Sequence, residues 1–157
     1  MSRPYMCRDF SCAHCHNLVS SAHLLSGVNN RNHCPYCLWS RHLDLYSAGD
    51  RLSACKAPMQ PVALTAKRSW NKYGHGRGEL MLVHLCTDCG NVSINRIAAD
   101  DDAQTLLEVF IISLALPART RDLLLGHGID ILPRQALPQL QLQLFGNAAH
   151  VRLAKIA

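Results

Sequence analysis

The sequence predicts an α+β fold, in which a small ribbon-like β domain with short helices precedes a C-terminal extension of helix and β-hairpin. Seven of the eight cysteines are arranged as three Cys-x2-Cys pairs and one single cysteine, a spacing typical of zinc ligands. Aromatic residues form only 6% of the chain, which suits a modest core cross-linked by metal. Cysteines stop before residue 102, where apolar helical periodicity begins. We therefore expect a zinc-ribbon-like β domain stabilised by two zinc sites.

The order of these signals along the chain divides it into three predicted segments: a leader over residues 1–9, a zinc-binding domain over 10–102 and an extension over 103–157. Inside the domain, a short strand is expected at residues 18–19. Turn-forming residues predict a loop or hairpin over 20–32, and one or two helical turns are expected over 38–45.

Two longer strands are predicted before the third cysteine pair, because apolar residues alternate over 59–64 and over 80–85. The intervening residues 67–79 contain three glycines, two aromatic residues and several cations, which predicts a long surface loop. Gly90 follows the third pair, where such a turn needs a positive φ.

The extension is predicted to begin with a helix over residues 103–116, with Asp102 as its N-cap and Pro117 as its stop. This helix has apolar residues on nearly all of its faces, so it should dock on the domain or offer a protein contact. A second helix is expected over 118–125. Leucine alternates with glutamine over 139–145, which predicts a β-hairpin with a return strand over 151–156.

Seven cysteines need one further ligand to complete two tetrahedral zinc sites, and His33, His42 and His84 are candidates. We favour His42, five residues after Cys37, and then His84. Either the first two pairs share one ion, or the first and third pairs do; spacing leaves both arrangements open. The predicted ligands are Cys12, Cys15, Cys34, Cys37, His42, Cys55, Cys86 and Cys89.

Several motifs together resemble those of the bacterial RNHCP domain family over about residues 10–102. They are Cys12-x2-Cys15, RNHCPYC at 31–37, Ser40-Arg41-His42-x-Asp44, Gly49-Asp50-Arg51, Cys55, Met59-x-Pro61, His84-x-Cys86-x2-Cys89-Gly90, and Asn95-Arg96-x-Ala98 with Asp100-Asp101. The loop over 65–79 is longer than in the family pattern, and Cys7 has no counterpart in it. The resemblance implies a small zinc protein and little about its biochemistry.

The chain has a formal charge of +5, and the excess lies in residues 1–100, with 11 Lys/Arg against 6 Asp/Glu. Two Zn(Cys)4 sites would lower that charge to about +1. The longest apolar stretch is too short to cross a bilayer, and the start has no apolar signal region. We expect a cytoplasmic protein without membrane partners, whose reduced thiols bind metal rather than form disulfides.

Four protein ligands on each zinc predict structural rather than catalytic metal, since a catalytic zinc keeps one position for water. No HExxH or HxE…PCxxC signature is present. The enzymatic alternative is a metal-dependent nuclease of the ββα-metal kind, using residues among Asn32, His33, His42, Asp44 and Asp50. A protein–protein adaptor is the other alternative.

The favoured prediction is a non-catalytic zinc protein that binds structured RNA, as a component of the bacterial ribosome or a factor on it. Cations would neutralise phosphates, and two aromatic residues would stack on unpaired bases. The predicted RNA-binding residues are Arg31, Arg41, Lys67, Arg68, Trp70, Lys72, Tyr73, Arg77 and Arg96. The alternative for the loop over 67–79 is a solvated excursion without a ligand.

Overall fold

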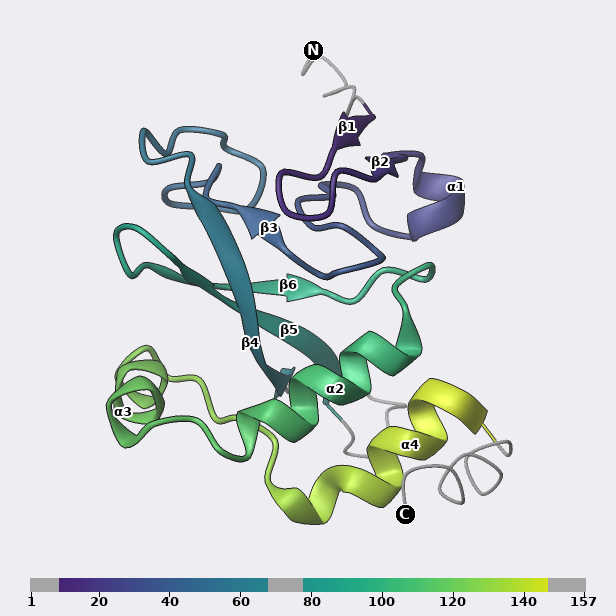
Figure 1. The fold of residues 1–157 in the computed structure, drawn as a ribbon, viewed down its shortest axis with the longest axis vertical. Helices are drawn as coiled ribbons and strands as arrows, with labels where there is room; N and C mark the ends of the chain where they lie inside the picture. The colour runs from purple at the N-terminus through teal and green to yellow at the C-terminus, as the bar shows by residue number, and fades with distance from the viewer. Residues whose placement is uncertain (1–8, 68–77, 147–157) are drawn as a thin grey trace.

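A computed structural model describes residues 9–67 and 78–146. It joins a curled antiparallel sheet to helices that follow it in the chain (Figure 1). The strands are β1 Phe10–Ser11, β2 Leu18–Val19, β3 Ser40–Arg41, β4 Pro58–Lys67, β5 Glu79–Cys86 and β6 Val92–Arg96. The helices are α1 His23–Ser26, α2 Ala103–Ser113, α3 Ala118–Gly126, the 3₁₀ helix η1 Arg134–Ala136 and α4 Leu137–Phe145.

The main sheet has four strands in the order β3-β4-β5-β6, each antiparallel to its neighbour, and β1 pairs with β2 separately. The register of β4 against β5 shifts between Pro61 and Ala63. Proline has no N–H to donate to a ladder, so an irregularity is expected beside it. The two long strands were predicted from sequence and are confirmed, with β4 extending further than expected.

The main core lies between this sheet and the helices α2 and α4. Leu64 of β4, Leu82 of β5 and Phe110 of α2 are all fully buried in it, together with Leu106 and Leu140. Burying one such side chain contributes about 1.5–3 kcal/mol. A smaller cluster joins β4 and β5 to α3 through Leu124. Helix α2 therefore docks on the chain's own sheet. Docking on the domain was one of the two predictions for this helix, and a protein contact was the other.

Helix α2 begins where Asp102 provides its N-cap, as predicted: the Asp102 carboxylate accepts from Thr105 N at 2.7 Å. The backbone N–H of Asp102 also donates to Pro35 O at 2.9 Å, which connects α2 to the second cysteine turn. The second helix, α3, is confirmed over Ala118–Gly126. Whether residue 102 is a domain boundary stays a prediction. No helix among the described residues is long and apolar enough to span a bilayer.

The predicted strand over 139–145 is wrong, because this segment is helix α4. Leu137, Leu140 and Leu144 are spaced at i, i+3 and i+7, a helical period, and all three belong to the main core. Leu142, which a strand would align with Leu140, is half exposed instead. The expected return strand over 151–156 lies outside the described residues.

Two shorter predictions also need correction. The helical turns expected over 38–45 are replaced by strand β3, which pairs with the start of β4 through Ser40↔Met59. The loop expected over 20–32 contains the short helix α1, which ends at Gly27 with a φ of 67°. In both places the tertiary contacts outweigh weak local signals.

Candidate metal centres

The three Cys-x2-Cys turns share one backbone arrangement. In each, the N–H of the first cysteine donates to the carbonyl five residues later, which closes a compact knuckle. The three bonds are Cys12 N to Asn17 O at 2.9 Å, Cys34 N to Trp39 O at 2.9 Å, and Cys86 N to Asn91 O at 2.8 Å. Each knuckle is therefore closed by a backbone hydrogen bond that does not depend on a metal ion.

The residue after the second cysteine has a positive φ in all three knuckles: His16 at 62°, Leu38 at 62° and Gly90 at 72°. The prediction for Gly90 is confirmed. For a residue with a Cβ this left-handed conformation costs about 1–2 kcal/mol, so the turns at His16 and Leu38 store strain that the rest of the structure must offset, whereas Gly90 avoids it.

The first centre combines the first two knuckles. The four sulfur atoms of Cys12, Cys15, Cys34 and Cys37 lie within 4.8 Å of one another. Cys12 and Cys37 sulfurs are 3.6 Å apart, and so are those of Cys15 and Cys34. Zn–S bonds of 2.3 Å in a tetrahedron require S···S edges of about 3.8 Å, whereas a disulfide requires about 2.05 Å. The spacing fits four thiolates around one zinc ion.

The second centre combines the third knuckle with two single residues, His42 after β3 and Cys55 before β4. Their ligand atoms, with those of Cys86 and Cys89, lie within 4.8 Å of one another. The sulfurs of Cys55 and Cys86 are 3.6 Å apart, and Cys89 Sγ lies 3.2 Å from His42 Nδ1. Two cysteine-rich groups are thus positioned to bind two zinc ions, as the sequence predicted.

The imidazole of His42 is oriented by a neighbour on the side away from the sulfurs. The side-chain amide of Asn91 lies 3.0 Å from His42 Nε2. With Nδ1 facing the metal position, Nε2 carries the hydrogen, so the Asn91 amide, whose Nδ2 is the atom 3.0 Å from Nε2, must turn by 180° to present its oxygen as the acceptor. The third knuckle therefore supplies two ligands and also the residue that sets the tautomer of a third.

The thiols of the first centre need a cation to become thiolates together. Burial raises the pKa of the Cys34 thiol to about 11, so without metal this sulfur keeps its proton at neutral pH. A zinc ion would replace those protons and stabilise the four adjacent negative charges. The donor set accordingly fits a thiolate-bound divalent metal.

The other two candidate histidines are engaged elsewhere. His84 is fully buried, and its Nε2 donates to Leu38 O at 2.7 Å while its Nδ1 accepts from the Asn95 amide at 2.9 Å. Burial, with a smaller contribution from repulsion by His33, lowers the pKa of His84 to about 3. His84 is therefore a neutral, doubly bonded core group, and neither metal group includes it.

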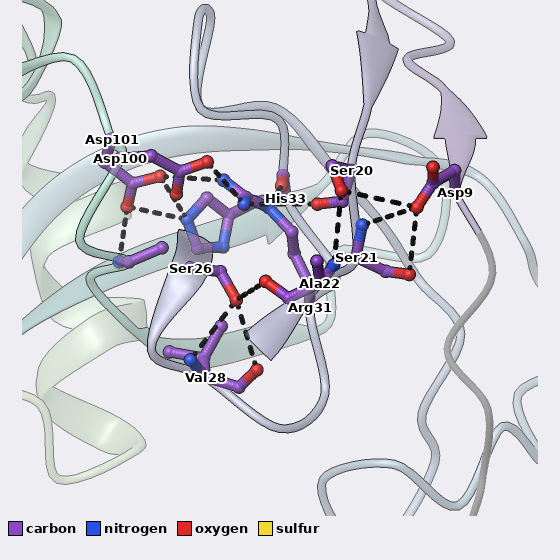
Figure 2. Close-up of polar contacts among 11 residues, drawn as sticks. Asp9, Ser20, Ser21, Ala22, Ser26, Val28, Arg31, His33, Asp100 and Asp101 are labelled. Carbon is purple, nitrogen blue, oxygen red and sulfur yellow. Dashed lines mark hydrogen bonds and ion pairs between the residues drawn. The ribbon is translucent and has the colours of Figure 1, made fainter. Parts of the chain in front are cut away.

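His33 and Arg31 form a buried clasp with the two aspartates that precede α2 (Figure 2). Arg31 Nη1 lies 2.8 Å from Asp100 Oδ2, and His33 Nε2 lies 2.8 Å from Asp101 Oδ2. Asp101 also accepts from Ala98 N at 2.7 Å. The side chains of Arg31 and Asp101 have no exposed area. The clasp joins positions about seventy residues apart. It holds the segment that leads into the second knuckle against the start of α2.

The clasp corrects one prediction: Arg31 cannot contact RNA phosphates, because its guanidinium is buried and already paired. Arg41 and Lys67 are exposed, whereas Arg96 is exposed but lies 2.9 Å from Glu79. The remaining predicted RNA-binding residues, Arg68, Trp70, Lys72, Tyr73 and Arg77, lie outside the described residues, as does Cys7.

One feature near the first centre was missed from sequence. The rings of His14 and Trp39 stack, with centroids 4.2 Å apart and planes 5° from parallel. His14 stands between the two cysteines of the first knuckle, and Trp39 follows the second. Their contact depends on the two knuckles meeting, so no local signal in the sequence could have revealed it.

Two groups of cysteine and histidine ligands on a mixed helix-and-sheet scaffold define a zinc-binding protein. A family model described as the RNHCP domain matches residues 7–107. The chain therefore belongs to the RNHCP domain family, and the resemblance seen in its motifs is confirmed. Comparison with curated proteins and with solved structures gives no match.

Proposed function

We propose that this is a non-catalytic protein in which two structural zinc ions shape a surface that binds structured RNA, and that it works on the ribosome in the cytoplasm. The proposed zinc ligands are the eight side chains of the two groups. Each group offers four protein donors, which fills a tetrahedral zinc and leaves no position for a reactive water.

The observation that carries the RNA proposal is a pair of exposed cations beside the second centre. Arg41 precedes the ligand His42, and Lys56 follows the ligand Cys55. Arg41 Nε donates to Lys56 O at 3.4 Å, so the two residues are neighbours. Within residues 9–67 and 78–146, neither cation forms an ion pair. Lys56 Nζ donates to the Arg51 carbonyl at 3.1 Å but has no carboxylate partner in the part of the chain that the structure describes. Exposed cations without a carboxylate partner favour a phosphate backbone as partner.

The net charge supports the same proposal more modestly. Zinc with four thiolates carries −2, and zinc with three thiolates and a neutral imidazole carries −1, so the formal charge of +5 becomes about +2. This is one unit more positive than the expectation based on two Zn(Cys)4 sites. A small excess is consistent with a few phosphate contacts and a shallow salt dependence.

The nuclease alternative loses support because its acid–base residues are occupied. His33 is buried against Asp101, and the Asn32 amide donates to Asp44 Oδ2 at 2.9 Å. Asp50 accepts backbone N–H bonds from Leu45 at 2.9 Å and Tyr46 at 2.8 Å, which stabilise the loop rather than a metal-bound water. His42 belongs to the second metal group.

The test is affinity capture and sedimentation of the zinc-loaded protein with ribosomal subunits, with and without ribonuclease. We expect co-sedimentation that weakens as salt rises and is lost in the Arg41→Ala/Lys56→Ala double variant. The control is Arg119→Ala/Arg121→Ala, which removes two exposed cations from α3 and should co-sediment normally. Capture of a protein partner that resists salt and ribonuclease would instead support an adaptor, and absence of any RNA-dependent capture would refute RNA binding.

A further inference from the structure

The stacked rings of His14 and Trp39 are held by the metal-binding knuckles themselves. The backbone N–H of His14 lies 3.4 Å from Cys12 Sγ, and the carbonyl of Trp39 accepts the knuckle bond from Cys34 N at 2.9 Å. Both backbones are therefore fixed by the first centre, and the ring planes are nearly parallel. Aromatic groups that are already ordered lose little conformational entropy when a ligand adds to the stack.

The stack is open to solvent and shares a face with a cation. His14 is exposed and Trp39 is half-buried, while along the chain Ser40 and His42 are buried and Arg41 is exposed. Trp39 directly precedes β3 and Arg41 ends it, and the alternating exposure places both side chains on the outward side of this segment. Lys56 adjoins Arg41 through the hydrogen bond to its carbonyl. The stacked rings and the two exposed cations are thus linked through residues 39–41, and together they form the candidate binding surface.

We propose that this surface binds one unpaired nucleotide of RNA, whose base adds to the His14–Trp39 stack while Arg41 and Lys56 contact the neighbouring phosphates. The inference rests on the proposed RNA-binding function and specifies its substrate as a single-stranded segment, such as a loop or bulge. A base inside a duplex has both faces covered by its neighbours, so only an unpaired base can extend the stack.

The charges around the rings favour a nucleotide over an apolar peptide. Asp88 of the third knuckle contacts Cys55 Sγ at 3.6 Å and pairs with neither Arg41 nor Lys56. A peptide partner would have to leave both cations unpaired or bring its own carboxylates, whereas a nucleic acid supplies a phosphate beside every base. Base–aromatic stacking with flanking cations is the usual chemistry of single-strand recognition.

The experiment uses Trp39 as its own reporter. The chain has two tryptophans, so the Trp70→Phe variant leaves Trp39 as the single indole. Because Trp70 is itself a predicted RNA-binding residue, phenylalanine keeps an aromatic ring there, and the RNA affinity of the variant is compared with that of the parent. Zinc-loaded protein is titrated with an RNA hairpin that has a single-stranded loop, with the same hairpin carrying abasic sites in that loop, and with a fully paired duplex. We expect quenching of Trp39 fluorescence by the intact loop, and little quenching by the abasic hairpin or the duplex.

Substitution then checks the second ring. His14→Ala should weaken loop binding about tenfold, as expected for the loss of part of a base-stacking platform. The matched control is His127→Ala, an exposed histidine at the end of α3, which should bind as tightly as the parent. Zinc content is measured for both variants. If His14→Ala loses zinc, the abasic-site comparison on the parent decides the question instead.

The possible outcomes distinguish the base-stacking site from RNA binding in general. Salt-dependent RNA binding with unchanged Trp39 fluorescence, or equal quenching by the abasic hairpin, overturns the stacking site while RNA binding stands. Failure to bind any RNA overturns both. A single-stranded DNA loop of the same sequence is the last arm: weaker binding than RNA supports the proposal, and tighter binding overturns the assignment to RNA.

Discussion

The two metal centres use the same ligand chemistry but connect the chain in different ways. The first centre joins two knuckles that lie within residues 12–37, and all four of its cysteines precede strand β3. The second centre joins His42, Cys55 and the β5–β6 turn, so it ties a long loop to the edge of the main sheet. The first centre orders a terminal segment, whereas the second cross-links the sheet.

The two centres also differ in how far their ligands are buried. In the first, Cys12 and Cys34 are buried with Val19 in a small core of their own. In the second, Cys89 is exposed although Cys86 and His42 are buried. A ligand reachable by solvent exchanges more readily, so the comparison suggests that zinc leaves the second centre first. We therefore expect two centres with the same motif to differ in how readily they release zinc, because the exposure of their sulfurs differs.

The largest expected effect comes from removing one ligand at each centre. Cys34→Ser and Cys89→Ser should each reduce bound zinc from two ions to one, and structural zinc contributes about 10–16 kcal/mol to the folding of small zinc modules. We expect Cys34→Ser to expose amides of residues 9–37 and Cys89→Ser to expose those of 42–57. Elemental analysis and hydrogen exchange measure both, and identical exchange patterns would refute the contrast.

Acid should release both zinc ions, because zinc-bound thiolates must take up protons that the free thiols hold. The pKa of the metal-free Cys34 thiol is raised to about 11, so zinc binding at neutral pH displaces a proton there. Zinc-derived stability is therefore present at neutral pH and is lost as pH falls. A chromogenic zinc indicator followed from pH 8 to 4 should report two steps, with the exposed second centre releasing first. A single step would contradict unequal lability.

Breaking the clasp should separate the first centre from α2 without touching a zinc ligand. Arg31→Met leaves the buried Asp101 carboxylate without its guanidinium, which costs about 3–5 kcal/mol. The matched control is Arg96→Met, whose partner Glu79 is exposed and whose loss should cost no more than about 1 kcal/mol. Denaturant unfolding of the zinc-loaded protein compares them. Equal costs for both variants would show that the clasp adds no stability.

The smallest expected change in stability comes from substitutions at equivalent turn positions of two knuckles. Gly90→Ala places a Cβ where nothing lies within 4 Å, so its cost of about 1 kcal/mol reflects backbone strain alone. His16→Gly relieves the same strain in the first knuckle and should stabilise by up to about 1 kcal/mol. Thermal unfolding with zinc in excess measures both, and shifts of the same sign would be inconsistent with a common left-handed turn.

Much of the site followed from spacing, because a Cys-x2-Cys turn is a local structure. The predicted set of eight ligands coincides with the residues of the two metal groups, and Asp102 was identified as a helix cap from its neighbours alone. The strand predicted over 139–145 is wrong because the alternation of Leu and Gln hides a second pattern: Leu137, Leu140 and Leu144 follow the helical spacing i, i+3 and i+7. Packing of Leu137 and Leu140 against α2 and the sheet selected the helix.

By itself, the sequence determined which residues could bind metal, where α2 begins, and that the ligands suffice for two zinc ions, since these depend on neighbours a few residues away. Only the tertiary structure decided which cysteine pairs come together, that His42 rather than His84 completes the second group, and that Arg31 pairs with Asp100 and Asp101 rather than with a surface partner. The physical reason is distance along the chain: each of these contacts joins segments 13 or more residues apart, so no local pattern encodes it.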